Sequence, residues 1–232
     1  MNHSAAEKTM LFERQPTQPL IYLITSGLTD ERTTPANADF ADILSVVSSA
    51  VAAQIDLVQI REKNLSASVL YELASRAAEI TSSTPTKLLI NDRSDIASAS
   101  GADGVHLTTS SLPAEVVRQT FGDQFLIGVS AHSFQEANIA RNSGADFAVF
   151  GPVFATASKR NYGDPLGLGA LASVSAKLAP FPILAIGGVN AGNVADCLAA
   201  GACGVAAITM LQQPAILADV AAQIRRGQKP DR

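Results

Sequence analysis

The chain has 232 residues, of which 47% are hydrophobic, so it can bury a core as one large α/β domain or as two small ones. Its formal net charge of −4 excludes a basic surface over the whole protein, so we expect no nucleic-acid partner. An anionic ligand must be bound by a local group of basic residues. The apolar stretches fall short of the roughly 18 residues that a membrane helix needs, and residues 1–18 show no secretory signal. We therefore expect a cytoplasmic protein with a leader over residues 1–18, in which Cys197 and Cys203 are buried thiols.

Short apolar runs recur along the chain and predict eight β-strands. In chain order they are PLIYLIT (19–25), IDLVQIRE (55–62), KLLIND (87–92), DGVHLT (103–108), FLIGVS (125–130), DFAVFGPV (146–153), PILAIGG (182–188) and CGVAAIT (203–209). Ala-rich stretches lie between the runs, and one of them (67–80) has helical spacing of Val69, Leu70, Leu73, Ala77 and Ile80. Unbroken Val, Ile and Leu runs are typical of parallel strands that are covered on both faces.

Strands that alternate with helices eight times predict one closed (β/α)8 TIM barrel, an α/β fold of about 250 residues. We expect this domain over residues 19–226, followed by a C-terminal tail over 227–232. An open doubly wound sheet is the alternative, but no Gly-x-Gly-x-x-Gly sequence opens the first helix, as a dinucleotide fold would require. The sequence does not decide the oligomeric state and leaves a homo-oligomer open.

Polar side chains follow the predicted strands, at the end where the chemistry of such barrels lies. Asn91 and Asp92, for example, come directly after the buried run LLI. The same end collects five of the 17 basic residues, namely Arg61, Lys63, Arg93, Lys159 and Arg160. Because concentrated positive charge in a concave site attracts anions, the sequence predicts a ligand with a phosphate or diphosphate group.

The sequence AIGGVNAGNVADC (185–197) is a second indication of an anion site. The strand ends on Gly187 and Gly188, and a helix is predicted to begin near Asn193, a residue type favoured at N-caps. Glycine has no Cβ, so backbone N–H groups can approach a phosphate closely, and a helix N-terminus adds partial positive charge. In these barrels, phosphate sites are frequently built from the loops after strands seven and eight.

Several of these segments together resemble one known family. VQIREKN, INDRSDIA, GADGVHL, IGVSAHS, GPVFATASK, AIGGVNAGNV and GACGVAAIT are similar, in this order from about Ile21 to Met210, to the thiamine phosphate synthase and thiazole tautomerase family. The resemblance is closer to the synthase branch and implies a transferase of thiamine biosynthesis. Such an enzyme joins a hydroxymethylpyrimidine diphosphate to a thiazole phosphate, and both small molecules would be its partners.

The resemblance also implies roles for residues of this chain. Arg61, Lys63 and Lys159 would neutralise the departing diphosphate, and Asp92 would bind one Mg²⁺ ion together with it. The implied metal ligands are Asp92 and Ser111, and the implied catalytic residues are Lys159, Ser130, Arg61, Lys63 and His132. The implied substrate-binding residues are Gln59, Ile60, Arg61, Glu62, Lys63, Asn91, Ser130, Thr156, Ala157, Ser158, Lys159, Gly188, Ile208 and Thr209.

Ser111 departs from the synthase pattern, in which a second metal-binding acid stands at this position. A neutral hydroxyl is a poorer Mg²⁺ ligand, although one or two carboxylates with substrate phosphates can hold the ion. Two alternatives therefore stay open: a thiazole tautomerase, in which a histidine at the place of His132 moves protons, and a non-catalytic protein that binds a phosphorylated ligand. The full basic set with Asn91 and Asp92 favours the synthase, because proton transfer on a monophosphate does not need it.

Some of the same residues have purely structural interpretations. Arg61 and Glu62 could form a surface ion pair, worth about 0–1 kcal/mol. Asp95 is predicted to cap the helix that follows it, and His106 to be a satisfied histidine inside the barrel. Ser111 could cap the helix PAEVVRQTF (113–121), and Lys159 and Arg160 could be solvated charges on a loop, although the length of that loop also suits a lid.

Overall fold

The computed structural model of the chain describes residues 18–156 and 164–226 and confirms the predicted fold. Eight parallel strands form a closed barrel in the order β1-β2-β3-β4-β5-β6-β7-β8. The chain divides into two compact units. The first unit contains Ile21–His106 and Ala207–Ala222, and the second contains Leu107–Ala206 with the described residues 18–20 and 223–226. Within the two described ranges, we find no helix with the length and hydropathy to span a membrane.

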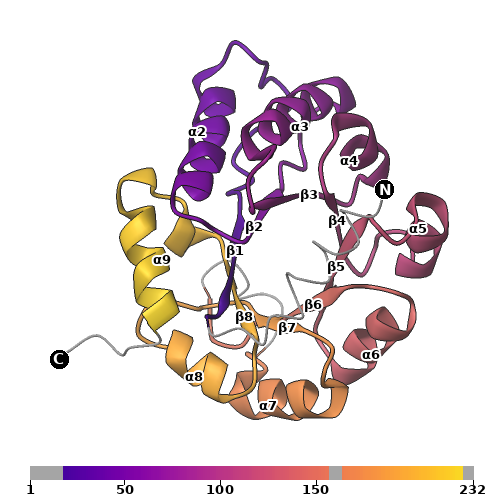
Figure 1. Cartoon of the computed structure of the whole chain (residues 1–232), viewed down its shortest axis with the longest axis vertical. Coiled ribbons are helices and arrows are strands. Elements are labelled where there is room, and N and C mark those ends of the chain that lie inside the picture. Colours follow the sequence, from indigo (N-terminus) through magenta and orange to yellow (C-terminus); the bar gives the residue numbers. More distant parts are fainter. Residues whose placement is uncertain (1–17, 157–163, 227–232) are drawn as a thin grey trace. The chain divides into compact units, whose positions relative to one another are not determined.

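The first unit contains the first four strands, and its helices lie on their outer side (Figure 1). The strands pair in parallel, with Tyr22 opposite Leu57 and Leu89 opposite Gly104. All strand residues of this unit except Lys87 are buried. Its elements are β1 (Leu20–Ile24), α2 (Ala38–Ala52), β2 (Leu57–Ile60), α3 (Ala67–Thr81), β3 (Lys87–Asn91), α4 (Ser94–Ser100), β4 (Gly104–Leu107), η2 (Thr209–Leu211), η3 (Pro214–Ile216) and most of α9 (Leu217–Arg226).

The second unit repeats the alternation of helix and strand. Gly128 lies opposite Phe147, and Leu184 lies opposite Gly204. Gly204 is required by packing, because a Cβ there would lie 2.2 Å from the carbonyl oxygen of Leu20. The elements are α5 (Ala114–Phe121), β5 (Leu126–Ala131), α6 (Phe134–Asn142), β6 (Phe147–Phe150), α7 (Gly167–Leu178), β7 (Ile183–Ala185), α8 (Val194–Ala199) and β8 (Gly204–Ala207).

The sequence-based elements are confirmed, although most strands are shorter than their apolar runs. The run 55–62, for example, is a strand only over Leu57–Ile60. The helix predicted over 67–80 is α3, where Leu70, Leu73 and Ala77 are buried as their spacing predicts. Both cysteines are free thiols, and burial raises the pKa of Cys197 to about 11.

Three aspartates stabilise the amino ends of the strands. Asp56 accepts the amide of Ile21 at 2.9 Å, Asp103 that of Leu88 at 2.8 Å, and Asp146 that of Ile127 at 2.7 Å. In each case the carboxylate precedes one strand and the amide belongs to the start of the strand before it. We call these three contacts the aspartate staples. They lie at the opposite ends of the strands from the predicted binding residues, so they serve stability and not chemistry.

Candidate active site

Side chains of β1, β2 and β4 form a buried polar network in the first unit. The side-chain amide of Gln59 donates to the Tyr22 hydroxyl at 2.8 Å, and this hydroxyl lies 3.2 Å from Nδ1 of His106. Burial lowers the pKa of His106 to about 3, with a smaller contribution from the cationic Arg61, so the ring is neutral at pH 7. His106 is thus a satisfied interior histidine, as predicted. Gln59 is 1% exposed, and its predicted contact with substrate stays a prediction.

Arg61 and Lys63 follow β2 directly. The amide of Arg61 donates to the Thr25 hydroxyl at 2.9 Å, and a Cβ on Gly27 would lie 3.2 Å from a guanidinium nitrogen of Arg61. The backbone after β1 therefore supports the Arg61 side chain. Lys63 is exposed, and neither cation forms an ion pair with a residue in the described ranges. Within the described ranges, no acidic partner therefore neutralises either charge.

Glu62, which lies between these two cations, is 3% exposed. Its carboxylate accepts hydrogen bonds from Thr25, Gly27 and Thr29 on the loop after β1. The interpretation of Arg61 and Glu62 as a surface ion pair is therefore wrong. The predicted contact of Glu62 with substrate is untested.

Asn91 and Asp92 end β3 in an unusual turn. The amide of Arg93 donates to the Asn91 carbonyl at 2.8 Å, which makes Asp92 the central residue of a three-residue γ-turn. Asp92 has a left-handed φ of 65°, a conformation that few residues other than glycine adopt and that is common at functional sites. Its backbone is held by a hydrogen bond to the carbonyl of His106, while its exposed carboxylate takes no hydrogen bond from any residue that the structure describes.

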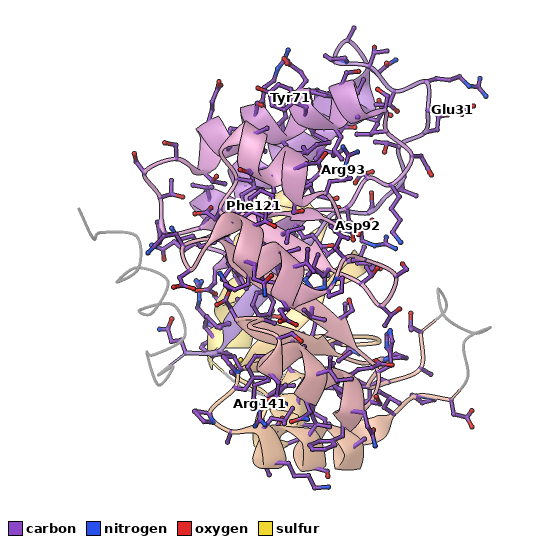
Figure 2. The ribbon with its side chains drawn as sticks, turned by 90° about the vertical axis from the view of Figure 1, so that its right-hand side faces the viewer. Glu31, Tyr71, Asp92, Arg93, Phe121 and Arg141 are labelled. Atoms are coloured by element: carbon purple, nitrogen blue, oxygen red, sulfur yellow. The ribbon has the colours of Figure 1, made fainter. Side chains whose placement is uncertain are left out.

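Arg93 is engaged by a neighbour, unlike Arg61. Its guanidinium donates to both carboxylate oxygens of Asp95, at 2.8 and 2.5 Å, and the Asp92 and Arg93 side chains can be followed in Figure 2. This hydrogen bond lowers the pKa of Asp95 and raises the pKa of Arg93. The predicted cap is wrong, because α4 begins at Ser94 and Asp95 lies in its first turn. Of the five basic residues predicted at this end of the barrel, Arg93 thus has its charge paired with Asp95.

Ile208 and Thr209, the last two residues of the predicted run 203–209, lie beyond the end of β8 and belong to the first unit. Thr209 begins the short helix η2 and is exposed. The side chain of Gln212, one residue beyond η2, donates to the carbonyl of Ile24 at 2.7 Å. This contact holds the segment after β8 against the carboxyl end of β1. The residue that follows β1, Thr25, also accepts the Arg61 amide.

Ser130 and His132 lie at the carboxyl end of β5 in the second unit. Nδ1 of His132 forms a hydrogen bond with the carbonyl oxygen of Gly151, and Glu136 accepts the His132 amide at 2.5 Å. A carbonyl can only accept, so Nδ1 must carry the proton, and in the neutral ring Nε2 keeps its lone pair. Ser130 is half-buried within β5.

Gly187 and Gly188 are required by the close approach of the segment after β6. A Cβ on Gly187 would lie 2.4 Å from Pro152, and one on Gly188 would lie 2.6 Å from the Ala155 carbonyl oxygen, with φ at 64°. The carbonyl of Gly188 accepts from Asn193, which is the N-cap position of α8 as predicted. The Gly188 amide has no acceptor among the described residues, so it can donate to an anion.

Ser111 closes the turn after β4. Its hydroxyl accepts the amide of Thr108 at 2.7 Å and lies 3.1 Å from the Thr108 hydroxyl. The interpretation of Ser111 as a helix cap is wrong, because Pro113 is the N-cap of α5. The Ser111 hydroxyl therefore has a structural role in this turn, and its predicted contact with a metal stays a prediction.

Part of the predicted site lies outside the described residues, namely Ala157, Ser158, Lys159 and Arg160, as do most of the leader and the tail 227–232. Thr156 is the last described residue before this gap and is half-buried. Ranges 18–156 and 164–226 contain no group of three or more His, Cys, Asp or Glu residues that could hold a metal ion by itself.

Sequence reasoning did not find Tyr22, Thr25 and Thr29, which bind the Gln59 side chain, the Arg61 backbone amide and the Glu62 carboxylate. The only signal was the placement of Tyr22 and Thr25 in the first apolar run, PLIYLIT. Threonine and tyrosine are common in strands for packing reasons alone, so their hydrogen bonds become visible only in the structure.

Comparison with known proteins gives one consistent result. The family model described as thiamine monophosphate synthase matches residues 28–211. The thiamine-phosphate synthase of Moorella thermoacetica is 42% identical over 183 residues, 79% of this chain and 85% of the relative. That of Clostridium novyi is 41% identical over 165 residues, 71% of this chain and 80% of the relative. Among solved structures, thiamine phosphate pyrophosphorylase from Pyrococcus furiosus matches with a TM-score of 0.73 and 28% identity, and the match covers 90% of this chain and 94% of the other.

Proposed function

Since the chain belongs to the thiamine monophosphate synthase family, we propose that it is a thiamine-phosphate synthase, a transferase of thiamine biosynthesis. The observation that carries the proposal is the match to curated synthases along at least four fifths of their own length. The pyrimidine diphosphate and thiazole phosphate substrates, one Mg²⁺ ion and a cytoplasmic location belong to the same proposal.

The proposed reaction is a dissociative substitution at the pyrimidine methylene carbon. The bond from this carbon to the diphosphate oxygen breaks, and its electron pair leaves with the diphosphate. The ring nitrogen of the thiazole then gives its lone pair to the resulting cation and forms the new C–N bond. Arg61, Lys63 and Lys159 neutralise the charge that builds up on the leaving group, which is the largest electrostatic change in the reaction. The absence of ion pairs for Arg61 and Lys63 among the described residues supports this role.

The second substrate carries a phosphate that needs hydrogen-bond donors. The Gly188 amide, which has no acceptor among the described residues, is suited to this group, and Thr209 offers an exposed hydroxyl. From the family resemblance, we propose that the thiazole phosphate also contacts Thr156, Ser158 and Ile208. The pyrimidine diphosphate would contact Ser130 and Asn91.

Asp92 fits an Mg²⁺ ion better than Ser111 does. Its carboxylate is exposed and unoccupied by the described residues, and it stands on a turn that fixes its direction. When bound with diphosphate oxygens and water, Mg²⁺ would neutralise part of the leaving group's charge. The Ser111 hydroxyl, in contrast, is engaged by Thr108.

The orientation of His132 favours a second candidate function, thiazole tautomerase. With Nδ1 donating to Gly151, the lone pair for the proton transfer of that reaction would be on Nε2, which has no hydrogen-bond partner among the described residues. A non-catalytic protein that binds a phosphorylated ligand is the third candidate, and the serine at position 111 is the feature that favours it.

One assay separates the three candidates. The purified protein is incubated with pyrimidine diphosphate and thiazole phosphate, with and without Mg²⁺, and the products are identified by mass and by chromatography. Thiamine phosphate formed only with Mg²⁺ supports the synthase. Isomerised thiazole without diphosphate release supports the tautomerase, and binding of either substrate without product supports the third candidate.

A further inference from the structure

The Glu62 carboxylate holds the loop after β1 through a dense set of hydrogen bonds. Oε1 accepts from the Thr25 hydroxyl at 2.6 Å and from the Gly27 amide at 3.1 Å. Oε2 accepts from the Thr29 hydroxyl at 2.7 Å and from its amide at 3.4 Å. Thr25 and Thr29 are 1% and 4% exposed, so these contacts are shielded from water. We call this arrangement the Glu62 clamp.

The clamped loop is in direct contact with Arg61. The Thr25 hydroxyl accepts the Arg61 amide and donates to Glu62, so it links the two residues through one oxygen. Gly27 lies against both the carbonyl and the guanidinium of Arg61 and has a φ of 72°. A movement of this loop would therefore change where the guanidinium lies.

A direct contact between Glu62 and the leaving group is unfavourable. A carboxylate repels a diphosphate, and both oxygens of Glu62 are already occupied by donors from the loop. Lys63 and Arg61 flank it in sequence, but its own charge is directed into the protein interior. The segment Arg61-Glu62-Lys63 therefore combines two residues that attract an anion with one, Glu62, that binds the loop after β1.

We infer that Glu62 is a positioning residue, which acts on the diphosphate through Arg61 by fixing the loop 25–29. This inference rests on the proposed function for the identity of the anion. A positioning role and a direct binding role for Glu62 predict opposite changes in diphosphate affinity when its charge is removed. If Glu62 only contributed charge near the ligand, its neutralisation would strengthen diphosphate binding; if it positions Arg61, its neutralisation weakens binding.

The test is calorimetric titration with inorganic diphosphate, which does not require turnover. In Glu62→Gln an amide replaces an oxygen that accepts two donors, so we expect the dissociation constant to rise by about tenfold or more. Thr29→Val removes one clamp donor and should weaken binding in the same direction, whereas Thr29→Ser keeps the hydroxyl and should bind like the wild type. Glu72→Gln is the matched control, because Glu72 pairs with Arg76 on the exposed face of α3.

A double-mutant cycle shows whether Glu62 acts through Arg61. In an Arg61→Ala background, Glu62→Gln should change diphosphate binding by less than about twofold, because the group that it positions is gone. In steady-state assays, Glu62→Gln should raise the KM for the pyrimidine diphosphate and leave the KM for the thiazole phosphate unchanged. A role in stability alone would lower the melting temperature without this selective effect.

The inference and the proposed function fail in different ways. Unchanged or tighter diphosphate binding by folded Glu62→Gln and Thr29→Val would overturn the inference, and so would full additivity with Arg61→Ala. If the wild type binds diphosphate but forms no thiamine phosphate, the proposed function fails. The diphosphate affinities of the wild type and the variants still decide the role of Glu62. Should Glu62→Gln not fold, the Thr29→Val and Thr29→Ser pair decides it alone.

Discussion

Asp146 and Ile127 are joined by two hydrogen bonds in opposite directions. The Ile127 amide donates to the Asp146 carboxylate at 2.7 Å, and the Asp146 amide donates to the Ile127 carbonyl at 2.8 Å. The same carboxylate accepts from the Arg118 guanidinium at 2.8 Å. We predict that Asp146→Ala lowers the free energy of unfolding by about 2–3 kcal/mol, because it leaves a buried amide without its acceptor. Urea unfolding measures this change, and Asp42→Ala on the exposed face of α2 should change stability by less than about 0.5 kcal/mol.

His106 should make stability depend on pH. Burial lowers its pKa from 6.5 to about 3, so between these values the unfolded chain binds a proton that the folded protein does not. Stability therefore falls as the pH falls from about 6.5 toward 3, by at most about 1.4 kcal/mol per pH unit from this group. His106→Asn keeps an acceptor for Tyr22 and cannot titrate, so its unfolding free energy should fall less steeply. Equal slopes for both proteins would contradict the buried neutral ring.

The pattern of apolar runs was sufficient to predict the fold, whereas the roles of single side chains were harder to predict. Eight apolar runs and Ala-rich stretches between them are sufficient for a (β/α)8 barrel, because each parallel strand must be covered on both faces. The tasks of Glu62 and Arg93 depend on what lies beside them in space. Glu62 contacts Thr25 and Thr29, more than 30 residues earlier, and no local pattern indicates these pairs.

Asp92 allows the metal to be tested without disturbing its turn. Asparagine also tolerates a left-handed φ, so Asp92→Asn should keep the γ-turn and remove the charge. We expect the Mg²⁺ concentration for half-maximal activity to rise about tenfold or more, with the melting temperature unchanged. An unaltered Mg²⁺ requirement would mean that the ion is bound elsewhere.

Ser111 offers the converse experiment. If this position aligns with the second acid of the synthases, Ser111→Asp should lower the Mg²⁺ concentration for half-maximal activity. The exchange also removes the hydroxyl that accepts the Thr108 amide, and the new carboxylate can accept that amide in its place. No change in the Mg²⁺ requirement would contradict the alignment. Thr109→Asp, in the same exposed turn, is the control for added charge.

Lys159 is expected to stabilise the departing diphosphate. Lys159→Ala should lower turnover about a hundredfold or more, the usual loss when one such electrostatic group is removed. Lys177→Ala on α7 is the control, because that lysine lies over the ring of Phe134 and has no proposed contact with substrate. A near-normal rate for Lys159→Ala would contradict its assignment.

The γ-turn at Asp92 shows why the candidate site could be predicted only in part. The residue types at the end of β3 indicated an acid and an amide beside an anion, and the family resemblance gave them roles. Neither indicated the left-handed φ, which aspartate tolerates but seldom adopts. Here the hydrogen bonds from the Asp92 amide to His106 and from the Arg93 amide to Asn91 hold it.

The aspartate staples separate the residues that stabilise the fold from those proposed for chemistry along β1 to β6. They fasten the amino ends through backbone amides and make no use of the segments that carry Arg61, Asp92, His132 or Gly188. Those segments can therefore lengthen, shorten or change composition while the scaffold keeps its register. A protein built in this way can acquire a new substrate by exchange of a few loops, and a designer who grafts foreign loops onto this chain should leave Asp56, Asp103 and Asp146 in place.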